Sequence, residues 1–247
     1  MKYRRLSAAI VVLCVPPFAA AQSVVVTPKK VVYKRSVRNV PDFKRTFEVR
    51  YPTFSGKLKP ASLRGLKTGT DYWRIFDTTL PDNLKDDTWL SRFDYVVKYN
   101  KHNLLDIWLI MEGVGAYPDG TTKYLVFDTR TGNKVDFPDL FMANRMPELL
   151  GKIRAVMKRT ESEIKDEEMR EALEAERETN PEFHPRPDQI GFKQLDFTIS
   201  EKGVTFLYDY GYPHVVQALE PSGEFFLSYA ELKPFIRPDG LLARFVR

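Results

Sequence analysis

Cysteine is almost absent from this sequence of 247 residues, which contains a single one, Cys14. Disulfide bonds and thiol catalysis are therefore excluded from everything that follows it. Histidine is nearly as scarce, with only His102, His184 and His214. Because imidazole is the usual neutral-pH base and a common zinc ligand, few residues are available for either role. His102 and His184 are expected to lie exposed in loops, and no metal or cofactor is predicted.

The sequence also lacks the short motifs of common enzymes. It has no Gly-x-Ser-x-Gly elbow, no His-Glu-x-x-His helix, no phosphate-binding loop and no Gly-x-Gly-x-x-Gly fingerprint. The acids Glu167, Glu168 and Glu171 fall in a charged helical stretch, which is typical of a solvated helix face rather than of paired carboxylates for glycan hydrolysis. Enzymatic activity is therefore not favoured. A glycan- or peptidoglycan-modifying hydrolase that uses His214 and an acid of the same loop, Glu220, or an accessory domain of such an enzyme, stays open as the alternative.

Long apolar runs are missing after the N-terminus. Residues 1–21 combine three basic residues, an apolar run from Leu6 to Val15, and small residues before a predicted cleavage site at Gln22. This pattern predicts a secretory signal peptide, with a retained anchor or a lipoprotein acylated at Cys14 as weaker alternatives. No later stretch approaches the ~20 apolar residues of a membrane span, so we expect a periplasmic or secreted chain without a transmembrane segment.

Positive charge is unevenly distributed. The formal net charge is +5, and the signal peptide contains three bases and no acid, while residues 22–40 contain five bases and no acid. The rest of the chain is therefore slightly acidic, which does not support a basic face for nucleic acid. The basic N-terminal segment, residues 22–41, is expected either to contact an anionic surface or to add a strand to a sheet edge.

Alternating apolar and polar residues predict strands in the first half of the chain. The alternation covers residues 47–51, where Pro52 is expected to end the strand, and residues 93–99. A polar turn at 100–103 and the apolar run from Leu104 to Met111 complete a predicted hairpin with a buried second strand. Asp106 lies inside that run, where a buried acid would have to be paired or open onto a pocket. Strand alternation is expected instead to place it on the open face of the sheet. A further strand is predicted at 124–127.

Helical periodicity dominates the centre of the chain, followed by a closing hairpin. One long helix, amphipathic and then charged, is predicted over 147–177, with Pro147 in its first turn and an i, i+4 pair between Glu161 and Lys165. A proline-rich link leads to a hairpin with arms at 195–200 and 204–210. The fold class is α+β, with antiparallel hairpins and room for two lobes. The predicted organisation is a β-rich lobe over 42–146, the helix and linker over 147–183, and a C-terminal hairpin lobe over 184–247.

Several short segments resemble one extracytoplasmic family. An apolar strand ends in the turn Asp128-Thr129-Arg130-Thr131-Gly132, the tripeptide Asp139-Leu140-Phe141 follows, and an aromatic strand–loop–strand order extends from Gly203 to Lys233. Residues 85–247 thereby resemble a family of domains of unknown function. That family is shared by the lysozyme-sensing ectodomain of a bacterial anti-sigma factor and the accessory domain of some peptidoglycan deacetylases. The resemblance implies a non-catalytic binding protein of the cell envelope.

The aromatic loop of this segment supplies the predicted binding residues. Tyrosine and proline offer rigid, amphipathic contact area, so Tyr212, Pro213 and His214 are expected to be exposed. The predicted set is Tyr210, Tyr212, Pro213, His214, Gln217 and Glu220. The resemblance implies a lysozyme-like muramidase or a wall glycan (peptidoglycan) as the partner. The family's usual Pro-Tyr-Glu sequence is replaced here by Tyr208-Asp209-Tyr210-Gly211-Tyr212, so the fold is expected to match better than the ligand. A free inhibitor, scavenger or envelope accessory protein is the expected role.

Overall fold

The computed structural model describes residues 24–35, 41–85, 90–115, 118–213 and 216–247. The first part of the chain forms a six-stranded sheet with the spatial order β1-β2-β3-β4-β5-β6. We call residues 24–134 the N-terminal lobe. Its strands are β1 (Val25–Lys34), β2 (Thr46–Ser55), β3 (Leu90–Lys101), β4 (Leu104–Val114), β5 (Pro118–Asp128) and β6 (Asn133–Lys134). Its helices are η1 (Asp42–Lys44), α1 (Pro60–Gly69), α2 (Tyr72–Ile75) and α3 (Leu80–Asn83).

The C-terminal lobe, residues 135–247, contains a three-stranded antiparallel sheet in the order β7-β8-β9. Its strands are β7 (Leu195–Ile199), β8 (Gly203–Tyr208) and β9 (Glu224–Ser228). Its α-helices are α4 (Phe137–Leu140), α5 (Met146–Ser162), α6 (Glu167–Thr179) and α7 (Tyr229–Leu232). Short 3-10 turns complete it: η2 (Ala143–Arg145), η3 (Pro187–Gln189), η4 (Phe192–Gln194), η5 (Gln217–Leu219) and η6 (Ala243–Phe245). The predicted α+β class is confirmed.

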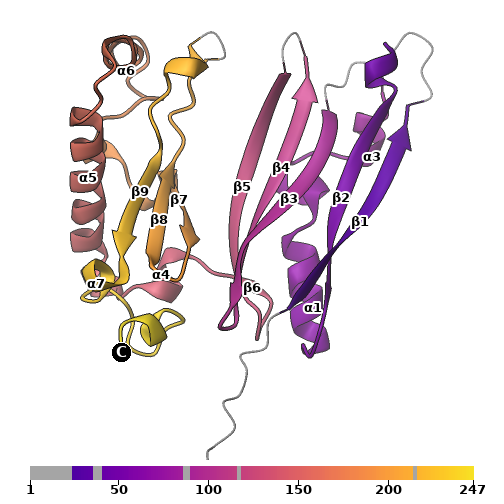
Figure 1. Cartoon of the computed structure of the whole chain (residues 1–247), viewed down its shortest axis with the longest axis horizontal. Helices are drawn as coiled ribbons and strands as arrows, with labels where there is room; N and C mark the ends of the chain where they lie inside the picture. The colour runs from indigo at the N-terminus through magenta and orange to yellow at the C-terminus, as the bar shows by residue number, and fades with distance from the viewer. Residues whose placement is uncertain (1–23, 36–40, 86–89, 116–117, 214–215) are drawn as a thin grey trace, which may run out of the picture.

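The elements are stacked in layers, as Figure 1 shows: α5 and α6, then the small sheet, then the large sheet, then α1 to α3. One face of the large sheet carries Leu105, Ile107 and Leu109 of β4, which are buried in a cluster with Leu66 of α1 and Tyr72 of α2. A second cluster joins α5, α6 and the small sheet to the other face of the large sheet. Each sheet therefore has a hydrophobic core on the side that its helices cover.

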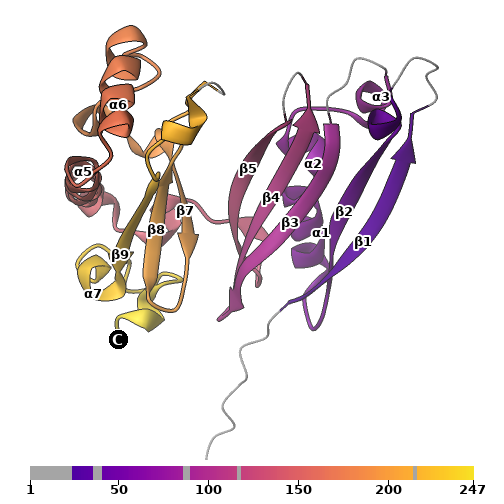
Figure 2. The same ribbon diagram turned by 45° about the horizontal axis from the view of Figure 1, so that its top comes forward.

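The two lobes meet at one end of the large sheet and diverge toward the other, as Figures 1 and 2 show. At the joined end, Tyr99, Leu104 and Val126 belong to the same buried cluster as the C-terminal lobe. The C-terminal residues reinforce this end, because the ring of Phe245 stacks on Tyr229 at 4.4 Å and contacts the ring of His102 at 5.8 Å. An ion pair of 2.9 Å between Lys101 and Glu201 also spans the joint.

The predicted hairpins are confirmed, and one strand prediction needs correction. The turn at His102 and Asn103 has φ angles of 59° and 63°, as a two-residue hairpin turn requires, and joins β3 to the buried β4. Strand β2 does not end at Pro52 but continues to Ser55. Pro52 is tolerated because it lies opposite Pro28 of β1 and beyond the two positions where β2 pairs with β3, so no ladder hydrogen bond needs its missing N–H.

The basic N-terminal segment adds an edge strand to the large sheet. Strand β1 pairs antiparallel with β2 over its full length, which confirms the strand-addition alternative. The Arg35 guanidinium that follows is buried and donates hydrogen bonds to the carbonyl oxygens of Lys44, Asn83 and Leu90. This arginine therefore fastens the edge strand to the lobe instead of contributing to a solvated basic tail.

The prediction of one long helix over 147–177 is wrong, because the helix is interrupted between Ser162 and Glu167. Asp166 starts the second helix as its N-cap, and its carboxylate accepts a hydrogen bond of 3.1 Å from the backbone N–H of Met169. Helix α6 thereby folds back beside α5. Glu161 pairs with Arg177 of α6 at 2.7 Å, in place of the expected local pair with Lys165.

Candidate functional site

The tyrosines of the predicted binding loop are buried, which corrects the prediction that Tyr212 is exposed. Tyr210 and Tyr212 are 3% and 6% exposed. Their rings form an edge-to-face ladder with Tyr208, at centroid distances of 4.9 Å and 6.3 Å along the series. The Tyr210 hydroxyl donates a hydrogen bond of 2.9 Å to Glu161 at the end of α5. The hydroxyphenyl groups thus hold the loop against the helix pair, because α5 and α6 cover the face on which they lie.

His184 is buried too, contrary to the expectation that it lies in an exposed loop. Its Nε2 lies 3.3 Å from a carboxylate oxygen of Glu176 on α6, and its ring meets the ring of Tyr212 edge-on at 5.7 Å. The proline-rich link therefore packs onto α6 through this imidazole. His102 lies half-buried in its turn, 4.0 Å from Glu201.

The remaining predicted loop residues are divided between solvent and a cleft. Pro213 and Gln217 are exposed, and His214 lies outside the described residues. Glu220 is half-buried, and its carboxylate accepts a hydrogen bond of 3.2 Å from the N–H of Gly211. Gly211 has a φ of 63°, which glycine adopts without strain at this bend. Glu220 is therefore the predicted residue that both shapes the loop and faces a cleft.

That cleft lies between the lobes, with a volume of about 480 Å³, and we call it the interlobe cleft. The N-terminal lobe contributes the start of β5, including Tyr124, whose ring contacts the cross-strand Trp108 at 4.9 Å. The C-terminal lobe contributes the edge of β7, the end of β8 and the loop before β9. Its acidic lining residues are Asp196, Asp209, Glu220 and Glu224, and the basic one is Lys123 of β5.

The carboxylates act on one another and on Tyr124. Enclosure by the two lobes raises the pKa of Asp196, although solvent still reaches this side chain. Burial and the neighbouring charge of Asp209 raise the pKa of Glu220. Burial also raises the pKa of the Tyr124 hydroxyl, and Asp209, Asp196 and Glu224 raise it further. The cleft therefore has a negative potential centred near Tyr124, and it favours a positively charged group.

Asp106 fixes the lobes at the joined end, below this cleft. It is fully buried, and its Oδ2 accepts hydrogen bonds from the Ile199 N–H at 2.7 Å and from the Thr198 hydroxyl. Burial raises its pKa to about 6, although both donors act to lower it. Strand alternation does place Asp106 on the face opposite α1, as predicted. The prediction that this face is open at Asp106 is wrong, because β7 covers it.

The described residues contain neither a metal-binding group of side chains nor a membrane-spanning helix. No group of three or more His, Cys, Asp or Glu side chains in this part of the chain is placed to hold a metal ion, the interlobe cleft included. None of the helices among the described residues has the length and apolar character that a bilayer crossing requires.

Most residues of the interlobe cleft were not identified from the sequence. Alternation along the predicted strand at 124–127 shows which residues share a face with Tyr124, so the sequence contained a signal for this side of the cleft. Asp196, Asp209 and Glu224 lie far from that strand in the chain. Only the contact between the lobes brings them together, and no spacing rule encodes that contact.

Comparison with known proteins identifies the fold. The sequence matches no protein-family model and no curated protein. Among solved structures, it resembles a DUF3298 family member from Bacteroides fragilis, with a TM-score of 0.50 and 12% identity over 92% of this chain and 98% of that one. A DUF3298 family protein from Pseudomonas aeruginosa has a TM-score of 0.48 and 15% identity over 88% of this chain and 95% of that one. The chain thus has the fold of a family of domains of unknown function. The link to the anti-sigma factor ectodomain and the deacetylase domain stays a prediction from the sequence.

Proposed function

We propose that this protein is a non-catalytic binding protein of the cell envelope, and that its partner inserts a positively charged segment into the interlobe cleft. A lysozyme-like muramidase is the partner that we favour over a wall glycan. The observation that carries this choice is the charge of the cleft, which has four carboxylates against one lysine. An anionic wall polymer would be repelled there, whereas a cationic protein is attracted.

The shape of the cleft is compatible with such a partner. A volume of about 480 Å³ accommodates a few side chains of a protruding loop and not a whole protein. A stable protein complex buries roughly 800 Å² on each partner, so the exposed rims of both lobes must supply the remaining contact. Pro213 and Gln217 lie exposed close in sequence to the cleft residue Glu220 and belong to that rim in this proposal.

The proposed cellular location rests on the sequence and not on the fold. Residues 1–21 carry the pattern of a signal peptide, and they lie outside the described residues. We propose export to the periplasm or the medium, where muramidases and wall glycan are both accessible. Immunodetection of the protein in periplasmic, medium and cytoplasmic fractions tests this part, and a cytoplasmic protein with an uncleaved N-terminus would contradict it.

Titration calorimetry of residues 22–247 with a C-type lysozyme at moderate salt tests the proposed partner. We expect saturable binding at micromolar or lower Kd that weakens as salt is raised, since the attraction is electrostatic. The charge reversal Glu224→Lys is expected to weaken binding at least tenfold, because it places a cation among the groups that attract the partner. Tyr124→Ala is expected to weaken it as well, through loss of the aromatic floor of the cleft.

Glu171→Lys is the matched control, because it makes the same charge change on an exposed face of α6 that does not line the cleft. Equal effects of Glu224→Lys and Glu171→Lys would mean that only net charge matters and would contradict the cleft as the binding site. Absence of binding, together with release of reducing ends from peptidoglycan by the wild type, would favour the hydrolase alternative. Saturable binding of soluble wall fragments instead of lysozyme would move the proposal to the glycan.

A further inference from the structure

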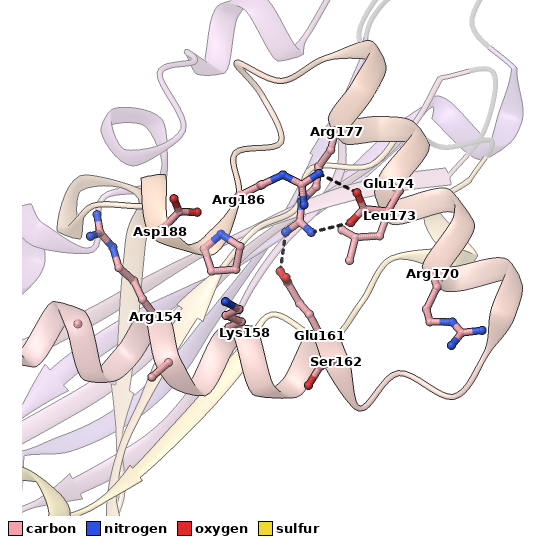
Figure 3. Close-up of a pocket in the computed structure, with 13 residues that line it drawn as sticks. Arg154, Lys158, Glu161, Ser162, Arg170, Leu173, Glu174, Arg177, Arg186 and Asp188 are labelled. Carbon is pink, nitrogen blue, oxygen red and sulfur yellow. Dashed lines mark hydrogen bonds and ion pairs between the residues drawn. The ribbon is translucent and has the colours of Figure 1, made fainter.

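A second pocket lies on the opposite side of the small sheet, between α5 and α6. The link that follows α6 closes it through Arg186, Pro187 and Asp188, and its volume is about 680 Å³. This is within the range of about 300 to 1,000 Å³ that small-molecule sites have. We call it the helix-pair pocket, and Figure 3 shows the side chains that line it. It shares no lining residue with the interlobe cleft, so an inference about it does not depend on the proposed function.

Basic side chains outnumber acidic ones in the helix-pair pocket. The acids that line it are Glu161, Glu174 and Asp188, and the bases are Arg154, Lys158, Arg170, Arg177 and Arg186. The pocket therefore has an excess of two positive charges. This is notable in a chain whose residues after the basic N-terminal segment are acidic overall. A local excess of positive charge attracts an anionic group.

The ion pairs in the pocket leave several of these cations uncompensated. Arg177 pairs with Glu161 at 2.7 Å and with Glu174 at 3.4 Å, and Arg186 shares Glu174 at 2.9 Å. Both arginines appear beside these carboxylates in Figure 3. Two carboxylates thus serve two arginines, and the pocket's charge excess comes from the other bases.

Three bases remain without a carboxylate partner in the described part of the chain. The Arg154 Nε donates to the neutral carbonyl oxygen of Ile190 at 2.8 Å, while Lys158 and Arg170 form no ion pair there. In addition, the Nε of Arg177 is buried and has no hydrogen-bond partner among the described residues. This buried donor is not satisfied by the ion pairs of Arg177 with Glu161 and Glu174.

Gly151 of α5 leaves unfilled space at one side of the pocket. Gly151 lies in the interior of α5, where glycine is less stable than alanine. No neighbouring structure explains the glycine, because an added Cβ would meet no atom within 4 Å. Together with Ala155, Leu173 and Pro187, it forms an apolar surface next to the bases. The pocket therefore combines an apolar wall with cationic donors.

We infer that the helix-pair pocket binds a small organic anion, whose oxyanion group is held by Lys158 and whose apolar body lies along Gly151, Ala155 and Leu173. Arg154 and Arg170 lie at opposite ends of the pocket (Figure 3) and add to its positive potential. The donors match a carboxylate or a phosphate equally well, since both accept several charge-assisted hydrogen bonds. Glu161 and Glu174 keep Arg177 and Arg186 in place, so the ligand needs to neutralise only the remaining bases.

Fluorescence titration of the purified protein with 8-anilinonaphthalene-1-sulfonate tests this inference, because the dye combines an apolar body with an oxyanion. We expect saturable 1:1 binding. N-phenyl-1-naphthylamine has the same aromatic body without the sulfonate, and we expect it to bind at least tenfold more weakly. Displacement of the dye by octanoate and by octyl phosphate then distinguishes a carboxylate ligand from a phosphate ligand, while octanol is expected to displace it poorly.

Two variants at exposed positions of α5 report on the two halves of the pocket. Lys158→Ala is expected to weaken dye binding about tenfold, and Arg159→Ala is the matched control on the same helix outside the pocket. Gly151→Trp is expected to abolish binding by filling the wall, at a position where there is space for a side chain. Circular dichroism and the urea midpoint of each variant verify that the fold is retained.

The inference is overturned by any of three results. The first is the absence of saturable dye binding by the wild type. The second is unchanged affinity in both Lys158→Ala and Gly151→Trp. The third is equal affinity for the sulfonated and the neutral dye, which would reduce the pocket to an apolar surface.

Discussion

Asp106 and Arg177 are both buried and ionisable, and each joins two elements of the fold. The groups with which they pair differ in charge. Asp106 attaches the large sheet to β7 through neutral donors, the Ile199 N–H and the Thr198 hydroxyl. Arg177 attaches α6 to α5 through the carboxylate of Glu161, 2.7 Å away, and both of these side chains are at most 10% exposed. The lobe joint, between the large sheet and β7, therefore depends on the dipoles of neutral donors. The helix joint, between α5 and α6, depends on an opposite charge.

The difference determines how each joint responds to pH. Neutral donors compensate only part of the desolvation of a carboxylate, so the pKa of Asp106 stays raised, at about 6. A matched pair loses its attraction only if one partner changes protonation, and arginine does not do so in this range. The contribution of Asp106 to the lobe joint is therefore lost as the pH rises through about 6.

The largest effect is expected when the charged joint is broken from one side. Glu161→Ala leaves Arg177 buried with the more exposed Glu174 as its remaining carboxylate, and it also removes the acceptor of the Tyr210 hydroxyl. Removal of one member of a buried pair typically costs roughly 3 to 5 kcal/mol, and we expect a loss of unfolding free energy in this range. Urea denaturation at pH 7 measures it.

Two further variants serve as controls for Glu161→Ala. Glu163→Ala changes an exposed acid at the end of α5 and is expected to alter stability by less than about 0.5 kcal/mol. The double variant Glu161→Leu with Arg177→Met removes both charges and is expected to be more stable than Glu161→Ala alone. A double variant that is less stable than the single one would show that the cost is lost packing rather than an uncompensated charge.

The lobe joint is expected to show the next largest effect, as a dependence on pH. The folded pKa of Asp106 lies above the ordinary value of 3.8, so its stabilising contribution is complete below about pH 4 and is lost as the pH rises through about 6. Relative to Asp106→Asn, the wild type is expected to lose about 3 kcal/mol of unfolding free energy between these limits and neutral pH. Urea denaturation of both proteins from pH 3.5 to 7.5 checks this.

Asp119→Asn is the control, because Asp119 is exposed on the adjacent strand β5. Its pH profile is expected to run parallel to that of the wild type. If Asp106→Asn also parallels the wild type, then the carboxyl of Asp106 is ionised as readily in the folded protein as in the unfolded one, and the proposed contrast between the joints fails.

The sequence predicted the strands better than it predicted their environment. Strand alternation and turn residues are local signals, and they located the ends of the β3–β4 hairpin within three residues and those of the closing pair β7 and β8 within two. The interruption of the central helix was missed, although Asp166 followed by Glu167 and Glu168 is a local signal of a helix start. Ile164, which lies in the break, packs against the C-terminal core. A charged stretch without proline or glycine gives no local signal of that packing.

The candidate sites depended still more on tertiary contacts. Tyr210 and Tyr212 were expected at a binding surface from their residue type, and α5 and α6 bury them instead. Among the predicted loop residues within the described part of the chain, Glu220 is the one that lines the interlobe cleft. The bases of the helix-pair pocket looked like a solvated helix face, because their convergence requires the reversal between α5 and α6.

The smallest expected effect comes from removing a single hydroxyl group at each joint. Thr198→Val removes a donor to Asp106, and Tyr210→Phe removes a donor to Glu161, so each is expected to cost about 1 to 2 kcal/mol at pH 7. Only the first should move the titration of Asp106. Loss of the Thr198 donor raises the pKa of Asp106 further, so the pH-dependent loss of stability shifts to higher pH, whereas Tyr210→Phe leaves the surroundings of Asp106 unchanged. Parallel pH profiles for both variants would mean that the Thr198 hydroxyl does not control the ionisation of Asp106, and the dipolar account of the lobe joint would no longer hold.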